Sequence, residues 1–166
     1  MIEGIGYKGL IDLSSLISAI IGGLFVLIGV MIQICKEKKK QQANEQQRQR
    51  YLSRNIYNEI EQNLELIYQS MGPLVVQDLS TVAWENSQGQ LGFLPPEVHN
   101  ACLMAYFRAH RCNSLAKNIR AECTRPEWPK EEILVTRNLY SAEFNLACRD
   151  FKAAKNKLDE FIREHA

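Results

Sequence analysis

The chain has 166 residues and a formal net charge of +1, a length with room for one modest domain and an accessory segment. The charge is unevenly placed, because residues 36–54 hold seven Lys or Arg and two Glu beside a long uncharged stretch. A basic strip in that position indicates a membrane surface, and it lacks the interleaved aromatic residues of a nucleic-acid site. The five cysteines, an odd number, argue against a disulfide framework.

Residues 13–35 form an uncharged apolar segment, LSSLISAIIGGLFVLIGVMIQIC. As a helix with a rise of about 1.5 Å per residue it would extend roughly 34 Å, enough to cross a hydrocarbon core of about 30 Å. A cleaved signal peptide, the competing interpretation, fits poorly, because the run is too long and no small-residue cleavage site follows it. We therefore expect a transmembrane helix at 13–35, preceded by a short extracytoplasmic tail at 1–12.

A cluster of lysines lies directly after the apolar segment: Lys36, Lys38, Lys39 and Lys40. Positively charged residues favour the cytosolic side of a membrane, where they also bind anionic headgroups. The sequence thus predicts a single-pass protein of the inner (plasma) membrane, with its N-terminus outside and its C-terminal domain in the cytosol. The lysines are expected to anchor the chain to the anionic inner leaflet.

The basic juxtamembrane stretch, residues 36–54, is expected to continue the membrane helix. It contains no glycine or proline and is rich in Gln, Glu, Lys and Arg, which are good helix formers. Apolar residues then recur at helical spacing at positions 52, 56, 60, 64, 67 and 71. The helix is therefore predicted to reach Gly72 and Pro73, with a flexible Gln-rich linker as the alternative.

The remaining chain is also predicted to be helical. A short helix or two turns are expected at 74–86, followed by a loop bounded by glycine and proline. A long helix should run from Pro96 to about Cys123 and a last one should begin near Pro129, because proline suits the first turn of a helix. The fold class is thus all-α: one N-terminal transmembrane helix continues into a cytosolic antiparallel helical bundle, residues 55–166, of three long helices and one short.

The last helix has the most regular pattern. Two sets of apolar residues recur every seven positions: Ile133, Tyr140, Ala147, Ala154 and Phe161, and, four residues after members of the first set, Phe144, Phe151 and Leu158. Such heptads form packing seams within a bundle or between subunits. Asn63 and Arg137 are polar residues within or beside apolar stripes. We expect them to fix contacts across the bundle or between subunits, with a solvated edge of each stripe as the alternative.

No cluster of residues that could carry out catalysis is recognisable. The G-x-G-x-x-G match that begins at Gly4 is preceded by only three residues and followed by the apolar segment, so it lacks the strand and helix of a dinucleotide site. The histidines, His99, His110 and His165, have no local signature of a base beside a nucleophile, and no CxxC or HxxxH pair indicates a metal site. We expect no enzyme activity, no cofactor and no metal ion.

The apolar segment carries small residues at helical spacing. Two rows are spaced by four: Ser14, Ser18 and Gly22, and Ser15, Ala19 and Gly23. Small residues let membrane helices approach closely, because lipid gives apolar side chains no reason to associate. We expect helix–helix contacts at Ser18, Gly22 and Gly29, and therefore a homo-oligomer.

The order of segments is similar to that of known proteins. One span and a basic stretch precede RNIYNEIEQNLELI (Arg54 to Ile67), the pair Trp84-Glu85, FLPPEV (Phe93 to Val98) and a helix with RCN (Arg111 to Asn113). This order resembles a widespread class of uncharacterised bacterial single-pass proteins with a cytosolic helical bundle, and is similar to the accessory membrane proteins of type VI-B CRISPR systems. The resemblance implies a helical domain related to HEPN-type ribonucleases and assembly into a membrane ring. The Arg-x4–6-His signature of those ribonucleases is absent here.

Three functions from different classes follow. The first, which we favour, is a non-enzymatic, self-associating membrane protein that forms a ring or pore as an effector in stress or antiviral defence. The second is a membrane-tethered adaptor whose bundle docks a protein partner. The third is a HEPN-like domain that lacks the ribonuclease motif, and no nucleic acid is expected as a partner.

Overall fold

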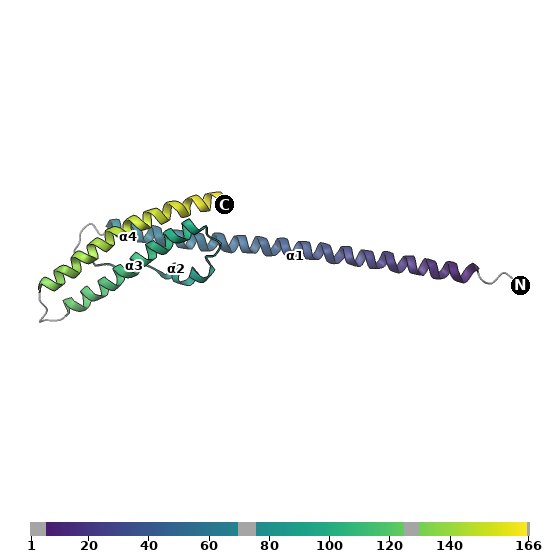
Figure 1. Cartoon of the computed structure of the whole chain (residues 1–166), viewed down its shortest axis with the longest axis horizontal. Coiled ribbons are helices and arrows are strands. Elements are labelled where there is room, and N and C mark those ends of the chain that lie inside the picture. Colours follow the sequence, from purple (N-terminus) through teal and green to yellow (C-terminus); the bar gives the residue numbers. More distant parts are fainter. Residues whose placement is uncertain (1–5, 70–75, 125–129, 166) are drawn as a thin grey trace. The chain divides into compact units, whose positions relative to one another are not determined.

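The computed structural model describes residues 6–69, 76–124 and 130–165. These residues form four α-helices and one short 3-10 helix and contain no β-strand, so the predicted all-α class is confirmed. The chain divides into two compact units, Met1–Gln46 and Gln47–Ala166, and helix α1 contributes to both. The second unit holds the other helices and forms a helical bundle (Figure 1).

Helix α1 runs without interruption over Gly6–Gln69. The basic stretch 36–54 is helical throughout, as predicted, and the flexible-linker alternative is wrong. Neither glycine nor proline occurs between Gly29 and the end of the helix, and long unbranched polar side chains lose little freedom when they become helical. The predicted end of this helix at Gly72 and Pro73 lies outside the described residues.

Two further long helices begin close to the positions predicted from proline. Helix α3 spans Pro96–Cys123, and helix α4 spans Lys130–His165. Proline fits the first turn of α3 because that turn needs no N–H donor and its φ is already helical. The carbonyl of Pro95 accepts bonds from the amides of Val98 (3.0 Å) and His99 (2.9 Å), which closes the first turn.

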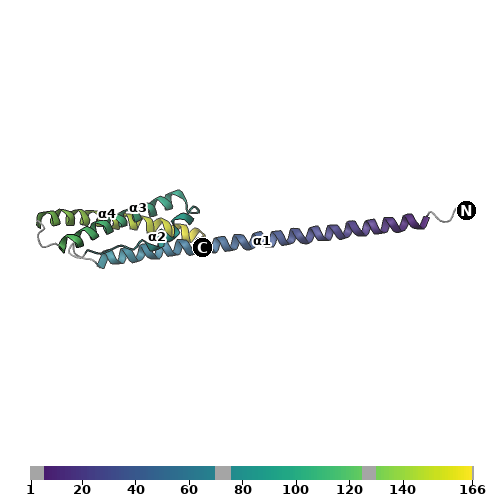
Figure 2. The ribbon, with the colours of Figure 1, turned by 90° about the horizontal axis from the view of Figure 1, so that it is seen from below.

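Helices α3 and α4 lie side by side and antiparallel within the bundle (Figures 1 and 2). Arg111 of α3 lies 2.9 Å from Glu143 of α4. Arg108, one turn earlier in α3, lies 3.5 Å from Asp150, two turns later in α4. The contacts therefore advance in opposite directions along the two helices.

The core side of α3 is lined mainly by small residues, whereas that of α4 carries several large ones. The buried residues of α3 with the three-four spacing of a heptad are Val98, Cys102, Ala105, Ala109, Cys112, Ala116 and Ile119. Buried apolar residues of α4 are Tyr140, Ala147, Phe151, Ala154, Leu158 and Phe161. The heptad predicted on α4 thus faces the bundle core from Tyr140 to Phe161, whereas Ile133 is only partly buried. The small side chains of α3 let the two backbones approach closely.

Of the segment predicted at 74–86 as a short helix or two turns, the described part before Val82 is not helical, and the part from Val82 is. Residues 76–81 are not helical, and helix α2 spans only Val82–Ser87. A 3-10 helix, η1, follows at Gln88–Gln90, inside the predicted loop. The physical reason lies in the backbone of the non-helical segment, whose N–H and C=O groups bond to side chains of the long helices instead of to one another.

Three aromatic rings join the short helix to α3 and α4. Trp84 of α2 stacks on Tyr106 of α3, with ring centroids 4.9 Å apart. The same Tyr106 meets Phe151 of α4 edge-on at 5.7 Å. All three rings are buried, so this row fixes α2 against the bundle.

We expect the packing of α4 to discriminate between two adjacent alanines. Ala154 is fully buried, whereas Ala153 is exposed. Ala154→Leu should lower the free energy of unfolding by about 1–3 kcal/mol, because the core has no space for three more carbons. Ala153→Leu, the matched control, should change it by less than about 0.5 kcal/mol. Urea unfolding in mild detergent, followed by circular dichroism, compares the two, and equal effects would contradict the burial described.

Candidate functional site

The N-terminal part of α1 is long and apolar enough to cross a membrane. Residues 15–35 are exposed, and no part of the most apolar window of this helix is buried. Ser18, Gly22 and Gly29 share one side of this helix, because four and seven residues correspond to about one and two turns. A methyl group added at either glycine would meet no atom within 4 Å. Contacts between copies at these three positions remain a prediction.

The basic cluster lies on the same exposed helix. Lys36, Lys38, Lys39 and Lys40 are all exposed. Consecutive helical residues turn by about 100°, so the four ammonium groups are distributed around the helix. Such an arrangement can meet lipid headgroups on several sides at once. The predicted anchoring to the inner leaflet concerns these four residues and stays a prediction.

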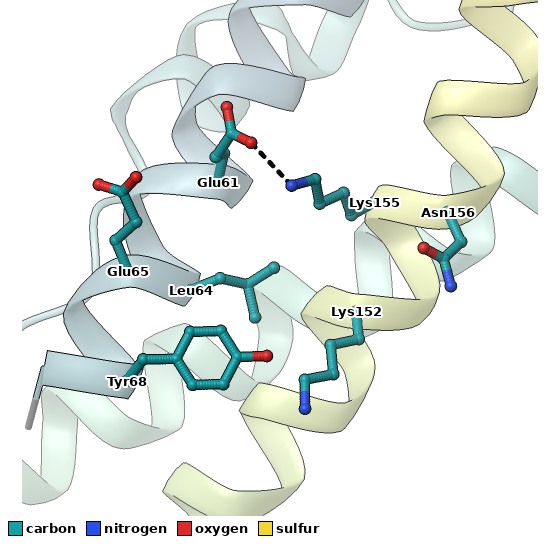
Figure 3. Close-up of a pocket in the computed structure, with 7 residues that line it drawn as sticks. All are labelled: Glu61, Leu64, Glu65, Tyr68, Lys152, Lys155 and Asn156. Carbon is teal, nitrogen blue, oxygen red and sulfur yellow. Dashed lines mark hydrogen bonds and ion pairs between the residues drawn. The ribbon is translucent and has the colours of Figure 1, made fainter. Parts of the chain in front are cut away.

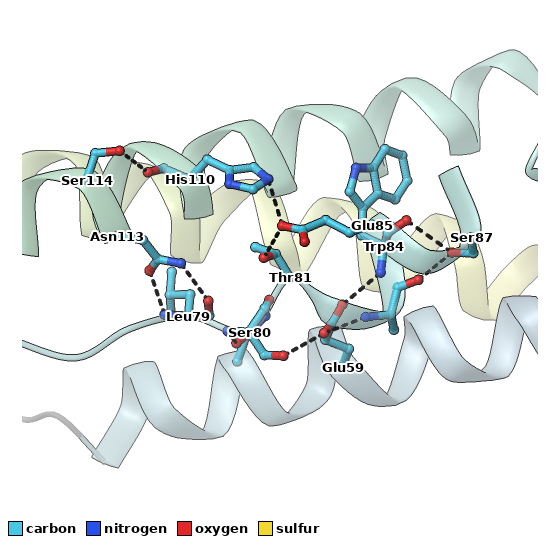
Figure 4. Close-up of polar contacts among 12 residues, drawn as sticks. Glu59, Leu79, Ser80, Thr81, Trp84, Glu85, Ser87, His110, Asn113 and Ser114 are labelled. Carbon is cyan, nitrogen blue, oxygen red and sulfur yellow. Dashed lines mark hydrogen bonds and ion pairs between the residues drawn. The ribbon is translucent and has the colours of Figure 1, made fainter. Parts of the chain in front are cut away.

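A polar site is formed by four side chains that bind the backbone and side chains of residues 77–84. We call Glu59, Asn63, Asn113 and Tyr140 the polar clasp. Glu59 and Asn63 belong to α1, Asn113 to α3 and Tyr140 to α4. Figure 4 shows Glu59 and Asn113 reaching the segment from different helices. Three helices therefore hold the non-helical residues 77–81 and the start of α2.

The two asparagines of the clasp bind the segment in the same way. Asn63 donates its side-chain amide to the carbonyl of Ser80 (2.8 Å) and accepts a bond from the Ser80 N–H (2.7 Å). Asn113 donates to the carbonyl of Leu79 (2.8 Å) and accepts from the Leu79 N–H (2.8 Å). One side-chain amide thus satisfies both backbone polar groups of one residue, as is needed where burial keeps water from them.

Glu59 binds the start of α2. Its carboxylate accepts bonds from the Ser80 hydroxyl (2.6 Å) and from the amides of Ala83 (2.9 Å) and Trp84 (3.1 Å). The first amides of a helix have no partner within the helix, so the carboxylate supplies what the helix itself cannot. Glu59 is only 5% exposed, and its loss would leave buried donors unpaired.

Tyr140 completes the clasp. Its hydroxyl donates to the carbonyl of Gln77 (3.0 Å) and accepts from the Gln77 N–H (3.1 Å). Burial raises the pKa of the Tyr140 phenol above its ordinary value, so the hydroxyl stays protonated and able to donate. Burial also raises the pKa of Tyr106, a residue near Glu59, and the negative charge of Glu59 adds to that rise.

Of the polar residues singled out in the sequence, Asn63 is fully buried in the clasp and does not lie at a solvated edge. Arg137 is partly buried on α4, and its shielded Nε has no hydrogen-bond partner among the described residues. The polar roles of Glu59, Asn113 and Tyr140 were not predicted. One signal was available, because Glu59 precedes Asn63 by four residues and so lies on the same side of α1.

A cluster of charges joins α3 to α4. Arg108 donates to Glu143 at 2.8 Å, and Arg111 approaches the other oxygen of the same carboxylate at 2.9 Å. Asp150 lies 3.5 Å from Arg108. The side chains of Arg108 and Glu143 are only 18% and 12% exposed, so salt screens this pair less than a surface pair. The cluster fixes the register of the two helices.

An open groove of about 400 Å³ lies between α1 and α4 (Figure 3). It is lined by Glu61, Leu64, Glu65, Tyr68, Lys152, Lys155 and Asn156. Lys155 donates to Glu61 at 2.7 Å, and this bond is the main cause of the raised pKa of Lys155. Lys152 lies 5.1 Å from the centre of the Tyr68 ring, and Tyr68 is the main cause of its raised pKa. Both ammonium groups are therefore engaged within the chain.

Within the described part of the chain, no group of three or more His, Cys, Asp or Glu side chains is placed to hold a metal ion. His110 lies 3.6 Å from Glu85 at the surface (Figure 4). Burial raises the pKa of the Cys102 and Cys112 thiols to about 12, so both stay protonated near neutral pH and are poor nucleophiles. The absence of enzyme activity and cofactors remains a prediction.

The clasp predicts a difference between two asparagines of α1. Asn63→Ala should cost roughly 2 kcal/mol or more of unfolding free energy, because both backbone groups of Ser80 lose their partner. Asn58→Ala, an exposed position on the same helix, should cost less than about 0.5 kcal/mol. Urea unfolding measures both costs. Hydrogen exchange at the Ser80 amide should quicken only in the Asn63 variant, and unchanged exchange there would contradict the clasp.

No known protein family matches the chain, and neither a curated protein nor a solved structure matches it. The similarity of its layout to the accessory membrane proteins of type VI-B CRISPR systems therefore stays an expectation from the sequence. The function has to be inferred from the exposed apolar helix, the lysines that follow it and the bundle.

Proposed function

We propose that the chain is a non-enzymatic, single-pass membrane protein whose copies associate and which holds a helical bundle at the cytosolic face of the inner (plasma) membrane. Residues 13–35 cross the bilayer, and the N-terminus lies outside. One observation carries the proposal: the apolar part of α1 is exposed around its whole circumference and is followed directly by lysines.

The apolar surface that α1 exposes is too large to be stable in contact with water. Thirteen large apolar side chains between Leu16 and Ile34 are each 46–70% exposed. Burying one fully exposed side chain of this kind is worth about 1.5–3 kcal/mol. Because each of the thirteen is only about half exposed, removing all of them from water is worth on the order of 20 kcal/mol. A partner helix would cover one side of α1 only, whereas lipid covers every side. A helix also satisfies its own backbone hydrogen bonds, which lipid requires.

Self-association is supported by the composition of one side of the span. Ser18, Gly22 and Gly29 expose little more than backbone there, so a second helix can come close along this side. A ring- or pore-forming effector in stress or antiviral defence is one form of this proposal. A membrane-tethered adaptor is the alternative, and the number of subunits separates the two.

The lysines are expected to set the orientation. Replacement of Lys36, Lys38, Lys39 and Lys40 by Gln should raise the inverted fraction, because positive charge beside a span favours the cytosolic side. A C-terminal fusion to a fluorescent protein that folds only in the cytosol reports one orientation, and a phosphatase active only outside reports the other. With the native lysines, the fluorescent fusion should be active and the phosphatase inactive. The reverse pattern would contradict the proposed orientation.

The small-residue side of the span predicts a specific loss of assembly. Gly22→Leu should lower the number of subunits in detergent, because the added side chain keeps two helices apart. Leu24→Phe adds volume on the opposite side and is the control. Native mass spectrometry measures the subunit number: a closed species of six or more would favour a ring, and a wild-type monomer would contradict self-association. Equal effects of the two substitutions would contradict the predicted side.

A further inference from the structure

Helix α4 has a second apolar stripe, on the side away from the bundle core. It consists of Val135, Leu139, Ala142 and Leu146, spaced by four, three and four residues. Val135 and Leu139 are 59% and 54% exposed, Ala142 is exposed and Leu146 is partly buried. This is the spacing of a heptad seam, and no element among the described residues covers Val135, Leu139 or Ala142.

The stripe ends in opposite charges. Glu131 precedes it and Arg149 follows it, and both are exposed. They are 18 residues apart, which is about five helical turns, so they lie on the same side of α4 as the stripe. At a rise of about 1.5 Å per residue they are roughly 27 Å apart, too far to pair within one chain.

The pattern is nearly the same from either end. Leu139 and Ala142 flank a midpoint between residues 140 and 141, and Val135 and Leu146 lie equally far from it on either side. Glu131 and Arg149 are centred on residue 140, within half a residue of that midpoint. A helix turned end to end about this point therefore presents apolar positions opposite apolar ones and an acid opposite a base.

We propose that this stripe is a contact with a second copy of the chain, in which two α4 helices pack antiparallel. Leu139 of one copy meets Ala142 of the other, a large residue against a small one, and Val135 meets Leu146. Glu131 of each copy lies beside Arg149 of the other, at both ends of the contact. The inference rests on the proposed self-association and names a surface for it outside the span.

The charges select this arrangement. A parallel pair would place Glu131 beside Glu131 and Arg149 beside Arg149, which is unfavourable at both ends. Arg149 has Asp150 as a neighbour at 3.2 Å, yet its side chain remains 70% exposed and can reach outward. Arg111 of the adjacent helix α3 is paired with Glu143. It therefore does not compete with Arg149 for Glu131.

The test uses the full chain in detergent micelles and charge reversal at the two ends. Glu131→Lys alone and Arg149→Glu alone should each weaken association roughly three- to tenfold, because like charges then face each other twice per dimer. The double variant should return to within about twofold of wild type, because it restores opposite charges. Sedimentation over a range of protein concentrations measures the association constants. No rescue in the double variant overturns the antiparallel pair.

Leu139→Lys tests the apolar part of the stripe. It should abolish the α4 contact, because a charge would be buried at its centre. Leu134→Lys is the control, because Leu134 is 60% exposed and lies on another side of α4. Circular dichroism should show both variants folded. Equal association of the two variants overturns the proposal, and the stripe would then belong to a different partner protein.

The outcomes separate this inference from the proposed function. An assembly that Gly22→Leu disrupts but that the α4 variants leave unchanged keeps the proposed function and overturns the α4 contact. Loss of assembly in Leu139→Lys, with a rescued charge pair, supports the α4 contact even where Gly22→Leu has no effect. A wild-type monomer at the highest concentration overturns both.

Discussion

The bundle depends on one requirement, which is that the backbone polar groups of the partly buried segment at 77–84 find partners within the protein. A helix or a sheet would satisfy such groups locally, and this segment forms neither before Val82. Side chains of α1, α3 and α4 supply the partners instead, so the segment is bound to each long helix of the bundle. The three helices are therefore tied together by polar bonds as well as by apolar packing, and none of the three could move apart without exposing unpaired donors.

The two parts of helix α1 have different surroundings, although the helix is continuous. Its first part carries apolar residues on every side, whereas its last part has a buried face that contains both apolar and polar residues. Glu59 and Asn63 lie on that buried face, where a continuous apolar stripe would have packed equally well but would have left Ser80 unbound. The polar positions thus specify which segment packs on α1, and the apolar positions supply the packing energy.

The long elements could be predicted because their limits are local. Proline marks the start of α3 at Pro96, and a stretch without proline or glycine continues as helix, as in residues 36–54. The segment at 76–81 could not be predicted in this way, because its conformation is set by Asn113 and Tyr140, which are distant in sequence. Asn63 was recognisable as a polar residue in an apolar stripe. The side of α3 that faces the core could not be recognised from the sequence, because Ala and Cys at heptad spacing give a weak hydrophobic signal.

The end-to-end symmetry of the outer stripe of α4 has a consequence for the membrane. A contact of this kind closes when two copies have met, so it cannot by itself build a ring. Copies inserted into one bilayer in the same direction are related by an axis along the membrane normal, and an antiparallel α4 pair would then lie parallel to the membrane surface. An upright α4 could form the same pair only with a copy in a second, facing bilayer. The contact would thus join neighbours in the first case and hold two membranes together in the second.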